Sequence, residues 1–233
     1  MIRLVNRATL LSALCLMAAS AVLAGVPNSN NSTKPTCVIL VSQESPGGAG
    51  ALPIPGLGNV AVHTYTIRDG ANNAVNNSVV TINMSVCVPG GGTEIKLSDP
   101  QTFAGVSRNC AAKTVSVTTN ASGVAVFRLL GRVLTNPGPG SGVASQCAVV
   151  TADGVPFGTV NVATGDLNGG GGINPADGAL FLADRDTPPA NTRNLARSDY
   201  NGSGLVNPAD GGIYIALQDY SLVDVTAGTD CLP

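Results

Sequence analysis

The sequence predicts a mainly β protein that ends in a small, duplicated α-helical unit. Seven short runs rich in β-branched residues, separated by Gly, Pro and Asn clusters, lie between residues 37 and 163, as expected of an antiparallel sandwich. Charged residues make up only 11% of the chain, which suits such a β domain better than a disordered tail. The last third of the chain then repeats a 21-residue pattern.

Residues 1–24 are predicted to be a signal peptide. The chain has a basic start and a short apolar run, and Val22 and Ala24 fit the small-residue rule for cleavage after Ala24. A membrane anchor is the alternative, but the run is short for a spanning helix. We therefore expect an exported bacterial protein, secreted or at the cell surface. The mature chain should have no membrane span, and residues 25–36 should be a linker.

The predicted strands have alternating or continuous apolar residues and are bounded by turn residues. They comprise residues 37–42, 59–67, 78–87, 113–119, 123–130, 143–151 and 158–163.

Two segments in this region combine alternating apolar residues with turns that contain Asn and Gly. They are IRDGANNAVNNSVVTINM at residues 67–84 and TTNASGVAVFRLLG at residues 118–131. Both resemble strand-turn-strand segments of bacterial Ig-like domains of the invasin type. The resemblance implies an Ig-like β-sandwich over residues 37–163, with a spacer or adhesive role and no fixed ligand.

Five of the six cysteines remain after removal of the signal peptide, and export favours their oxidation. We predict a disulfide between Cys87 and Cys110, because the stretch between them opens with a Pro/Gly cluster and is expected to be a long loop. The odd count leaves at least one cysteine unpaired or bonded to another chain. The second pair stays open, and Cys231 is one candidate to tether the C-terminal unit to the sandwich.

The run DLNGGGGINPADGALFLADRD at 166–186 recurs at 199–219 as DYNGSGLVNPADGGIYIALQD, with 11 of 21 positions identical. The identities are mostly acids, amides, glycines and a Pro-Ala pair, which indicates a duplicated ion-binding loop rather than a duplicated core. An EF-hand calcium loop supplies oxygen ligands from its positions 1, 3, 5, 7, 9 and 12, so we predict two Ca²⁺ ions. Those positions hold Asp166, Asn168, Gly170, Gly172, Asn174 and Asp177 in the first loop, and Asp199, Asn201, Ser203, Leu205, Asn207 and Asp210 in the second.

Each loop precedes an apolar stretch long enough for about three turns of helix. This tandem loop-helix unit resembles a type I dockerin module over residues 164–231. The resemblance implies calcium in each repeat, two antiparallel helices and one face that docks onto a cohesin domain. The family's partner-contacting positions 10 and 11 are usually polar; here they are Pro175, Ala176, Pro208 and Ala209.

Asn, Asp and Gly are also common in turns and at helix N-termini, so the alternative is a pair of turns that only cap two helices. Duplication of the ligand spacing favours the metal site. The four glycines at 169–172 are not followed by Lys-Ser or Lys-Thr, which argues against a phosphate loop. Residues 162–233 hold 9 of the 14 acidic residues against 3 Arg, and nothing suggests a nucleic-acid surface.

We predict that the chain is not an enzyme. Its one histidine, His63, lies in a strand pattern, and the acidic residues of the β region lie mostly beside turn residues. Aromatic residues are few and Trp is absent, which is unusual for a glycosidase. The first functional hypothesis is a calcium-dependent attachment protein with a protein partner, cohesin-like or a copy of itself. The second is a structural or adhesive surface protein whose calcium module docks on its own sandwich or a neighbouring subunit, and the third and least favoured is a carbohydrate-binding protein.

Overall fold

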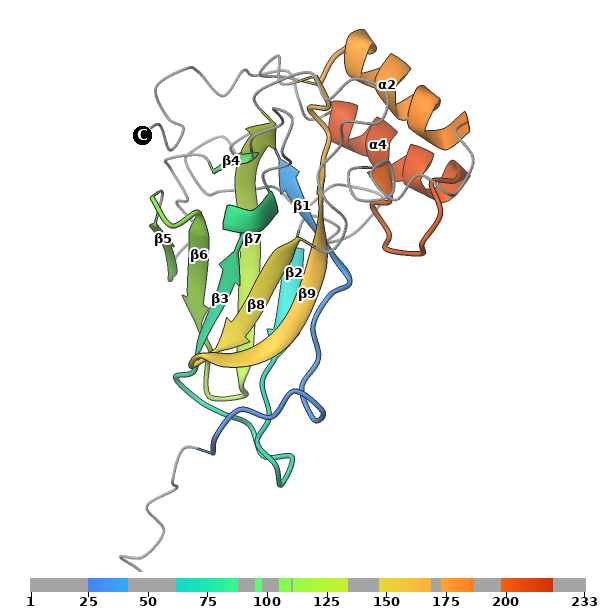
Figure 1. Ribbon diagram of the computed structural model, residues 1–233. Coiled ribbons are helices and arrows are strands. Elements are labelled where there is room, and N and C mark those ends of the chain that lie inside the picture. Colours follow the sequence, from blue (N-terminus) through green and yellow to red (C-terminus); the bar gives the residue numbers. More distant parts are fainter. Residues whose placement is uncertain are drawn as a thin grey trace, which may run out of the picture.

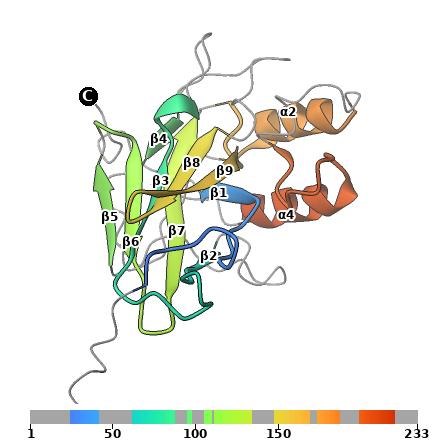
Figure 2. The same cartoon turned by 60° about the horizontal axis from the view of Figure 1, so that its bottom comes forward.

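The protein is mainly β, as predicted, and its described residues form a curled sheet with the helices α2 and α4 at one end (Figure 1). The helices lie beside one another in both views (Figures 1 and 2). The computed structural model describes residues 25–41, 62–87, 95–97, 105–109, 111–133, 147–168, 173–186 and 198–219.

Within these residues the elements follow the order of short strands first and helices last. They are β1 (Cys37–Val41), β2 (Val62–Thr66), β3 (Val79–Asn83), the 3-10 turn η1 (Ser85–Cys87), β4 (Ile95–Leu97), β5 (Val106–Asn109), β6 (Thr114–Thr118), β7 (Val124–Val133), β8 (Ala148–Ala152), β9 (Val155–Thr164), α2 (Pro175–Asp186) and α4 (Pro208–Asp219).

The sheet is mixed, so the expectation of a purely antiparallel sheet was wrong. Its described strands run in the order β2-β7-β1-β9-β8-β3-β6-β5, with β4 also paired to β7. β1 pairs in parallel with both β7 and β9, whereas the other pairs are antiparallel. The reason is visible in the sequence CVILV of β1, because a continuous apolar run is typical of a strand buried on both faces between parallel neighbours.

All seven predicted strands have counterparts, but β4 and β5 were missed. Both lie between Cys87 and Cys110, where we expected a long loop. The predicted Cys87–Cys110 disulfide is wrong, because Cys87 bonds to Cys147 with a Cα–Cα distance of 4.8 Å. This bridge joins η1 to the start of β8 inside the core. Cys110 and Cys231 lie outside the described residues.

The segment expected to be a linker, residues 25–36, pairs with the end of β2. Thr33 and Thr66 exchange two backbone hydrogen bonds of 2.9 and 3.0 Å, and Asn28 N–H donates to the Arg68 carbonyl at 2.7 Å. The chain before β1 is therefore hydrogen-bonded to the end of β2 and to the residues that follow it.

His63 has the structural role that its strand position predicted. Its Nε2 accepts a 2.9 Å hydrogen bond from the Ile39 N–H, one residue before the pairing between β1 and β7 begins at Leu40. The ring is buried, and burial lowers the pKa of His63 to about 4, opposed by the Ile39 carbonyl, which lies 3.4 Å from Nε2 and favours a protonated ring. The neutral imidazole thus satisfies a buried backbone donor that the sheet leaves unpaired.

The depressed pKa of His63 predicts a loss of stability in acid. The unfolded chain has the ordinary pKa of about 6.5 and binds this proton more readily, so the contribution of His63 is present above pH 6.5 and is lost as pH falls towards 4. We expect a loss of on the order of 2 kcal/mol between pH 7 and pH 4.5. His63→Gln keeps an acceptor without titrating, so urea unfolding of the two proteins should show this slope only in the wild type. Equal slopes would contradict the assignment.

Candidate metal centre

The repeated Asn-Pro-Ala-Asp segments start the two helices. Asn207 is the N-cap of α4: its Oδ1 accepts the Ala209 N–H at 2.8 Å, and Asp210 Oδ2 accepts the Asn207 N–H at 2.9 Å. Asn174 and Asp177 make the equivalent bonds at α2. This reciprocal arrangement is a capping box, and the proline occupies the first helical position, where no N–H is needed. The capping alternative is therefore part of the structure in both repeats.

The same aspartates also reach back across their loops. Asp210 Oδ1 accepts the Asn201 N–H at 3.1 Å, and Asp177 Oδ1 accepts the Asn168 N–H at 2.8 Å. Each carboxylate, at loop position 12, therefore accepts hydrogen bonds from the residue at loop position 3 and from the helix N-cap. These bonds hold the loop against the start of the helix. The spacing of the repeat thus produces the same closed geometry twice.

In the second loop, the oxygens of positions 1 and 7 lie close to the Ser203 hydroxyl at position 5. The Ser203 hydroxyl lies 3.2 Å from the Leu205 carbonyl oxygen and 3.5 Å from Asp199 Oδ1. Asp199 also accepts the N–H groups of Ser203 and Gly204, at 3.0 and 2.7 Å. These are the ligand positions of a calcium loop, held in one place by the backbone.

The four carboxylates at the first and last positions of the loops are removed from solvent. Asp166, Asp177, Asp199 and Asp210 are each at most 1% exposed. Burial raises the pKa of Asp177 against the backbone hydrogen bonds that lower it. The pKa of Asp210 is raised first by burial and further by the charge of Asp199. A divalent cation in the second loop would offset the burial of Asp210 and its repulsion from Asp199, because it attracts both of these carboxylates.

The donors present fit calcium better than a softer metal. An ionised carboxylate has about four acceptor positions, and backbone hydrogen bonds from Asn201, Asn207 and Tyr200 do not fill all those of Asp210, so acceptor capacity is left for a cation. In the described part of the chain, no three His, Cys, Asp or Glu side chains cluster as a metal site. A cation here would need amide, hydroxyl and carbonyl oxygens beside the carboxylates, which is the donor chemistry of calcium.

The side-chain oxygens of the predicted Asn ligands accept backbone hydrogen bonds that differ with their position in the loop. Asn174 and Asn207, at position 9, direct Oδ1 to the helix N–H groups, so their route to a cation would run through water. Asn201 Oδ1 accepts the Ser203 N–H at 2.9 Å. Gly170 and Gly172 lie outside the described residues.

An aromatic stack that the sequence analysis missed joins the two repeats. Phe181 and Tyr214 occupy equivalent positions, and their rings stack with centroids 4.9 Å apart and planes 5° apart. A Cβ on Gly178 would lie 3.5 Å from the Tyr214 hydroxyl, and one on the equivalent Gly211 would lie 3.7 Å from the Phe181 ring. Reciprocal contacts between equivalent residues indicate a pseudo-twofold axis. The missed signal was the recurrence of an aromatic residue four positions after the last acid of each loop.

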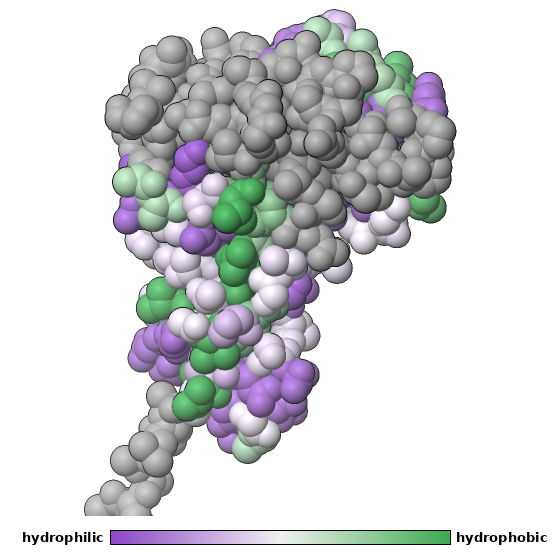
Figure 3. All heavy atoms as spheres, in the orientation of Figure 1, coloured by the Kyte–Doolittle hydropathy of each residue, from purple (hydrophilic) through white to green (hydrophobic). Residues whose placement is uncertain are grey.

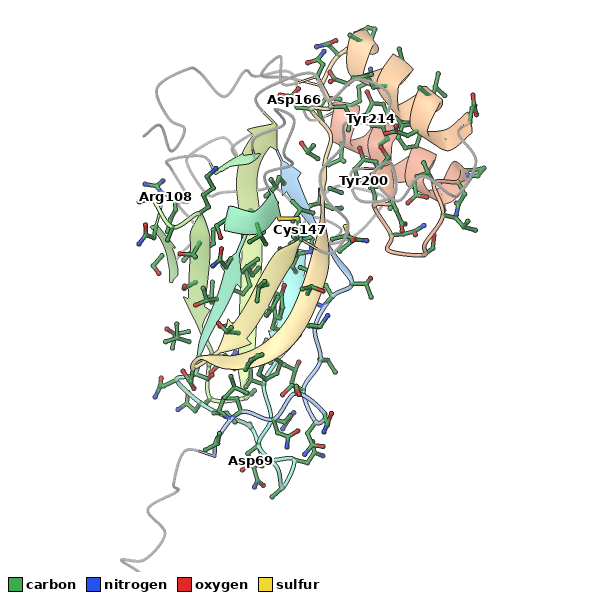
Figure 4. The ribbon with its side chains drawn as sticks, in the orientation of Figure 1. Asp69, Arg108, Cys147, Asp166, Tyr200 and Tyr214 are labelled. Atoms are coloured by element: carbon green, nitrogen blue, oxygen red, sulfur yellow. A yellow bond between two sulfur atoms is a disulfide. The ribbon has the colours of Figure 1, made fainter. Side chains whose placement is uncertain are left out.

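The second repeat packs against the sheet. Tyr200 donates from its hydroxyl to the Thr164 carbonyl at the end of β9, at 2.8 Å (Figure 4). A Cβ on Gly202 would overlap Thr36 Oγ1 and would lie 3.7 Å from Cys37 Cβ, so only glycine fits beneath this loop. Cys37 and Ile39 of β1 share one apolar cluster with Tyr200 and residues of both helices.

The predicted partner residues lie on the surface. Pro175, Ala176, Pro208 and Ala209 are all exposed. On the same helices Leu182 and Ile215, which are also equivalent by repeat position, are 46% and 59% exposed. The module therefore has two matching, weakly polar outer faces.

Comparison with known proteins gives no match to a family, to a curated protein or to a solved structure. Neither helix among the described residues is long and apolar enough to cross a membrane. A functional proposal therefore depends on the geometry of the loops and their surroundings.

Calcium and protons should compete for the same carboxylates. The raised pKa values of Asp177 and Asp210 mean that the metal-free fold binds protons more tightly than the unfolded chain, so its stability rises as pH falls towards those values. Calcium at 100 times the Kd of a loop should add about 2.7 kcal/mol for that loop at pH 7 and less at pH 5. Thermal unfolding with calcium and with EDTA at each pH measures the stability that calcium adds. The titration of His63 affects both samples equally and therefore cancels from this difference. A difference that is zero at pH 7 would contradict calcium binding.

We expect the second loop to bind calcium more tightly than the first. Position 5 is Ser203 in the second loop and Gly170 in the first, so only the second has a side-chain oxygen there. Ordering consecutive glycines also costs more chain entropy. Calorimetric titration of Asp166→Ala and Asp199→Ala should show that Asp199→Ala removes the tighter site, and Gly170→Asp should strengthen the first. Retention of the tighter site in Asp199→Ala would reverse the ranking.

Proposed function

We propose that this chain is an exported, non-catalytic calcium-binding protein that attaches to a partner or assembles through a dockerin-like module. The observation that carries the proposal is the pair of duplicated loops, each with its first and last carboxylate buried to at most 1% exposure. Helix capping accounts for an aspartate at the helix start, but it does not require a second buried carboxylate in each loop. Two calcium ions would balance these four charges.

The outer faces of α2 and α4 support attachment to a protein. Their exposed Pro-Ala pairs and the exposed Leu182 and Ile215 are apolar or weakly polar and are duplicated by the repeat. An apolar centre with a polar rim is the composition of many protein interfaces. The proposed partner is a cohesin-like domain or a second copy of this chain, and the β region is proposed to be an Ig-like sandwich that acts as a spacer.

The two faces should be able to replace each other. Pro175→Asp with Ala176→Asp changes one face and should fold normally, because Asp is favourable in the first helical turn. This double variant should keep most partner binding, whereas the same changes at Pro208 and Ala209 as well should abolish it. Calcium-dependent co-purification or sedimentation against each variant measures this. Val86→Asp, at an exposed apolar site of η1, is the matched control and should bind normally. Full loss in the first double variant would contradict two equivalent faces.

The second hypothesis, a structural or adhesive protein whose module docks on its own β domain, is favoured by the cluster shared between the helices and β1. In that case calcium would stabilise the whole molecule and not only the repeats. A carbohydrate-binding role has no comparable observation in its favour and remains the least favoured.

The thiol of Cys37 distinguishes a coupled module from an independent one. Burial raises the pKa of Cys37 to about 12, with a further contribution from Asp199, so the thiol should be unreactive while the second loop covers it. In a Cys110→Ser, Cys231→Ser background, EDTA should increase labelling of Cys37 severalfold, and calcium should reverse the increase. Labelling independent of calcium, in protein shown by calorimetry to bind it, would indicate that the loops do not stabilise β1.

A further inference from the structure

We propose that the Asp69 carboxylate binds the α-amino group created at Gly25 when the signal peptide is removed, so that the new N-terminus is held only in the mature protein. This inference rests on the predicted cleavage after Ala24 and is independent of calcium. It assigns a role to a part of the molecule far from the helices, at the hydrophilic end in Figure 3, where Figure 4 labels Asp69.

Gly25 lies directly against the side chain of Asp69. A Cβ built on Gly25 would overlap the Cβ, Cγ and Oδ2 of Asp69. Any other residue at position 25 would therefore displace this carboxylate or the chain. The backbone of Gly25 therefore lies directly beside the carboxylate, and an ammonium group formed at this residue would be within reach of it.

The position of Gly25 is set by the pairing of the segment that follows it. Pro27 and Asp69 form an antiparallel bridge, and Asn28 N–H donates to the Arg68 carbonyl at 2.7 Å. Asn31 Nδ2 donates to the Asp69 carbonyl at 2.8 Å. Two residues after Gly25 the chain is thus paired with the segment that follows β2, which restricts where a new terminus can lie.

The carboxylate of Asp69 is held in place by its own turn. Oδ1 accepts the N–H groups of Ala71 and Asn73 at 2.9 and 2.8 Å, and Oδ2 accepts Asn73 Nδ2 at 3.2 Å. The bonds from Asn73 lower the pKa of Asp69, so the group is ionised at neutral pH. These donors are neutral, and Oδ2, the oxygen nearer Gly25, has acceptor capacity left. The adjacent cation along the chain is Arg68.

Cleavage changes the chemistry of the Gly25 nitrogen. In the precursor it is a neutral amide with one hydrogen. Hydrolysis breaks the Ala24–Gly25 peptide bond, water supplies the hydroxyl of the new Ala24 carboxylate and a proton for the amine, and a second proton from solvent gives an ammonium with three donors. Charge-assisted hydrogen bonds are stronger than neutral ones, so Asp69 gains a charged partner only through this step.

The test is the α-amino pKa of the mature chain, measured by NMR after ¹³C-methylation of the exported protein. We expect a value roughly half a unit above the ordinary range of about 7.7–8.0, returning to that range in Asp69→Asn. Asn can still accept the two N–H bonds through Oδ1, so the turn should persist. Asp153→Asn is the matched control, because Asp153, in the turn between β8 and β9, also accepts a backbone N–H, from Val79 of β3. It should leave the value unchanged, and Arg68→Gln should raise it or leave it unchanged.

Added salt and an extra N-terminal residue should each remove the shift of the α-amino pKa. Raising the salt from about 0.05 M to about 1 M should remove the shift, because the pair is exposed. A chain that retains Ala24 moves its amine away from Asp69 and should show an ordinary value. Mass spectrometry that places the mature N-terminus at another residue, or an α-amino pKa that is equal in wild type and Asp69→Asn, would overturn the proposal.

Discussion

The rest of the structure depends on the burial of β1 on both faces. Val38 and Leu40 point into the core that β2, β3 and β6 to β9 enclose, whereas Cys37 and Ile39 point to the helices. Four consecutive apolar side chains therefore join two clusters across one strand. Because successive side chains of a strand point to opposite faces, a shift of β1 by one residue against β7 and β9 would exchange the two faces and disrupt both clusters.

The loops combine helix capping with cation chemistry without conflict. A carboxylate at the third helical position can accept the N-cap N–H and the N–H of loop position 3 and still have acceptor capacity for a cation. The cost is that two carboxylates are buried close together, and the pKa of Asp210 is raised first by burial and further by the charge of Asp199. Apolar packing by the aromatic stack and by β1 opposes this cost in the metal-free fold, and a cation would remove it.

The parts of the fold that local sequence determines were predictable. Strands with β-branched alternation and Asn- or Gly-rich turns were identified, and so were the starts of both helices, because their signals lie within a few residues. β4 and β5 were missed because runs of three and four residues carry too little pattern. The Cys87–Cys147 pairing and the parallel placement of β1 depend on contacts between distant segments, which spacing does not encode. The ligand spacing of the loops was read from the sequence, whereas the position of Gly202 over Cys37 required the structure.

The two repeats differ at two positions that face the rest of the molecule, and they are alike at three positions that face outward. On the inner side Tyr200, which bonds Thr164, replaces Leu167 of the first repeat. Asp184, buried and bonded to Ser198 at 2.5 Å, has Leu217 as its equivalent. On the outer side the Pro-Ala pairs are identical, and Leu182 and Ile215 are both exposed aliphatic residues. Proline at the first helical position is explained by capping, but an exposed Leu or Ile adds nothing to a cap. Both repeats thus have an aliphatic residue at an exposed position where packing inside the protein does not require one. This is the physical argument for an external partner on that face.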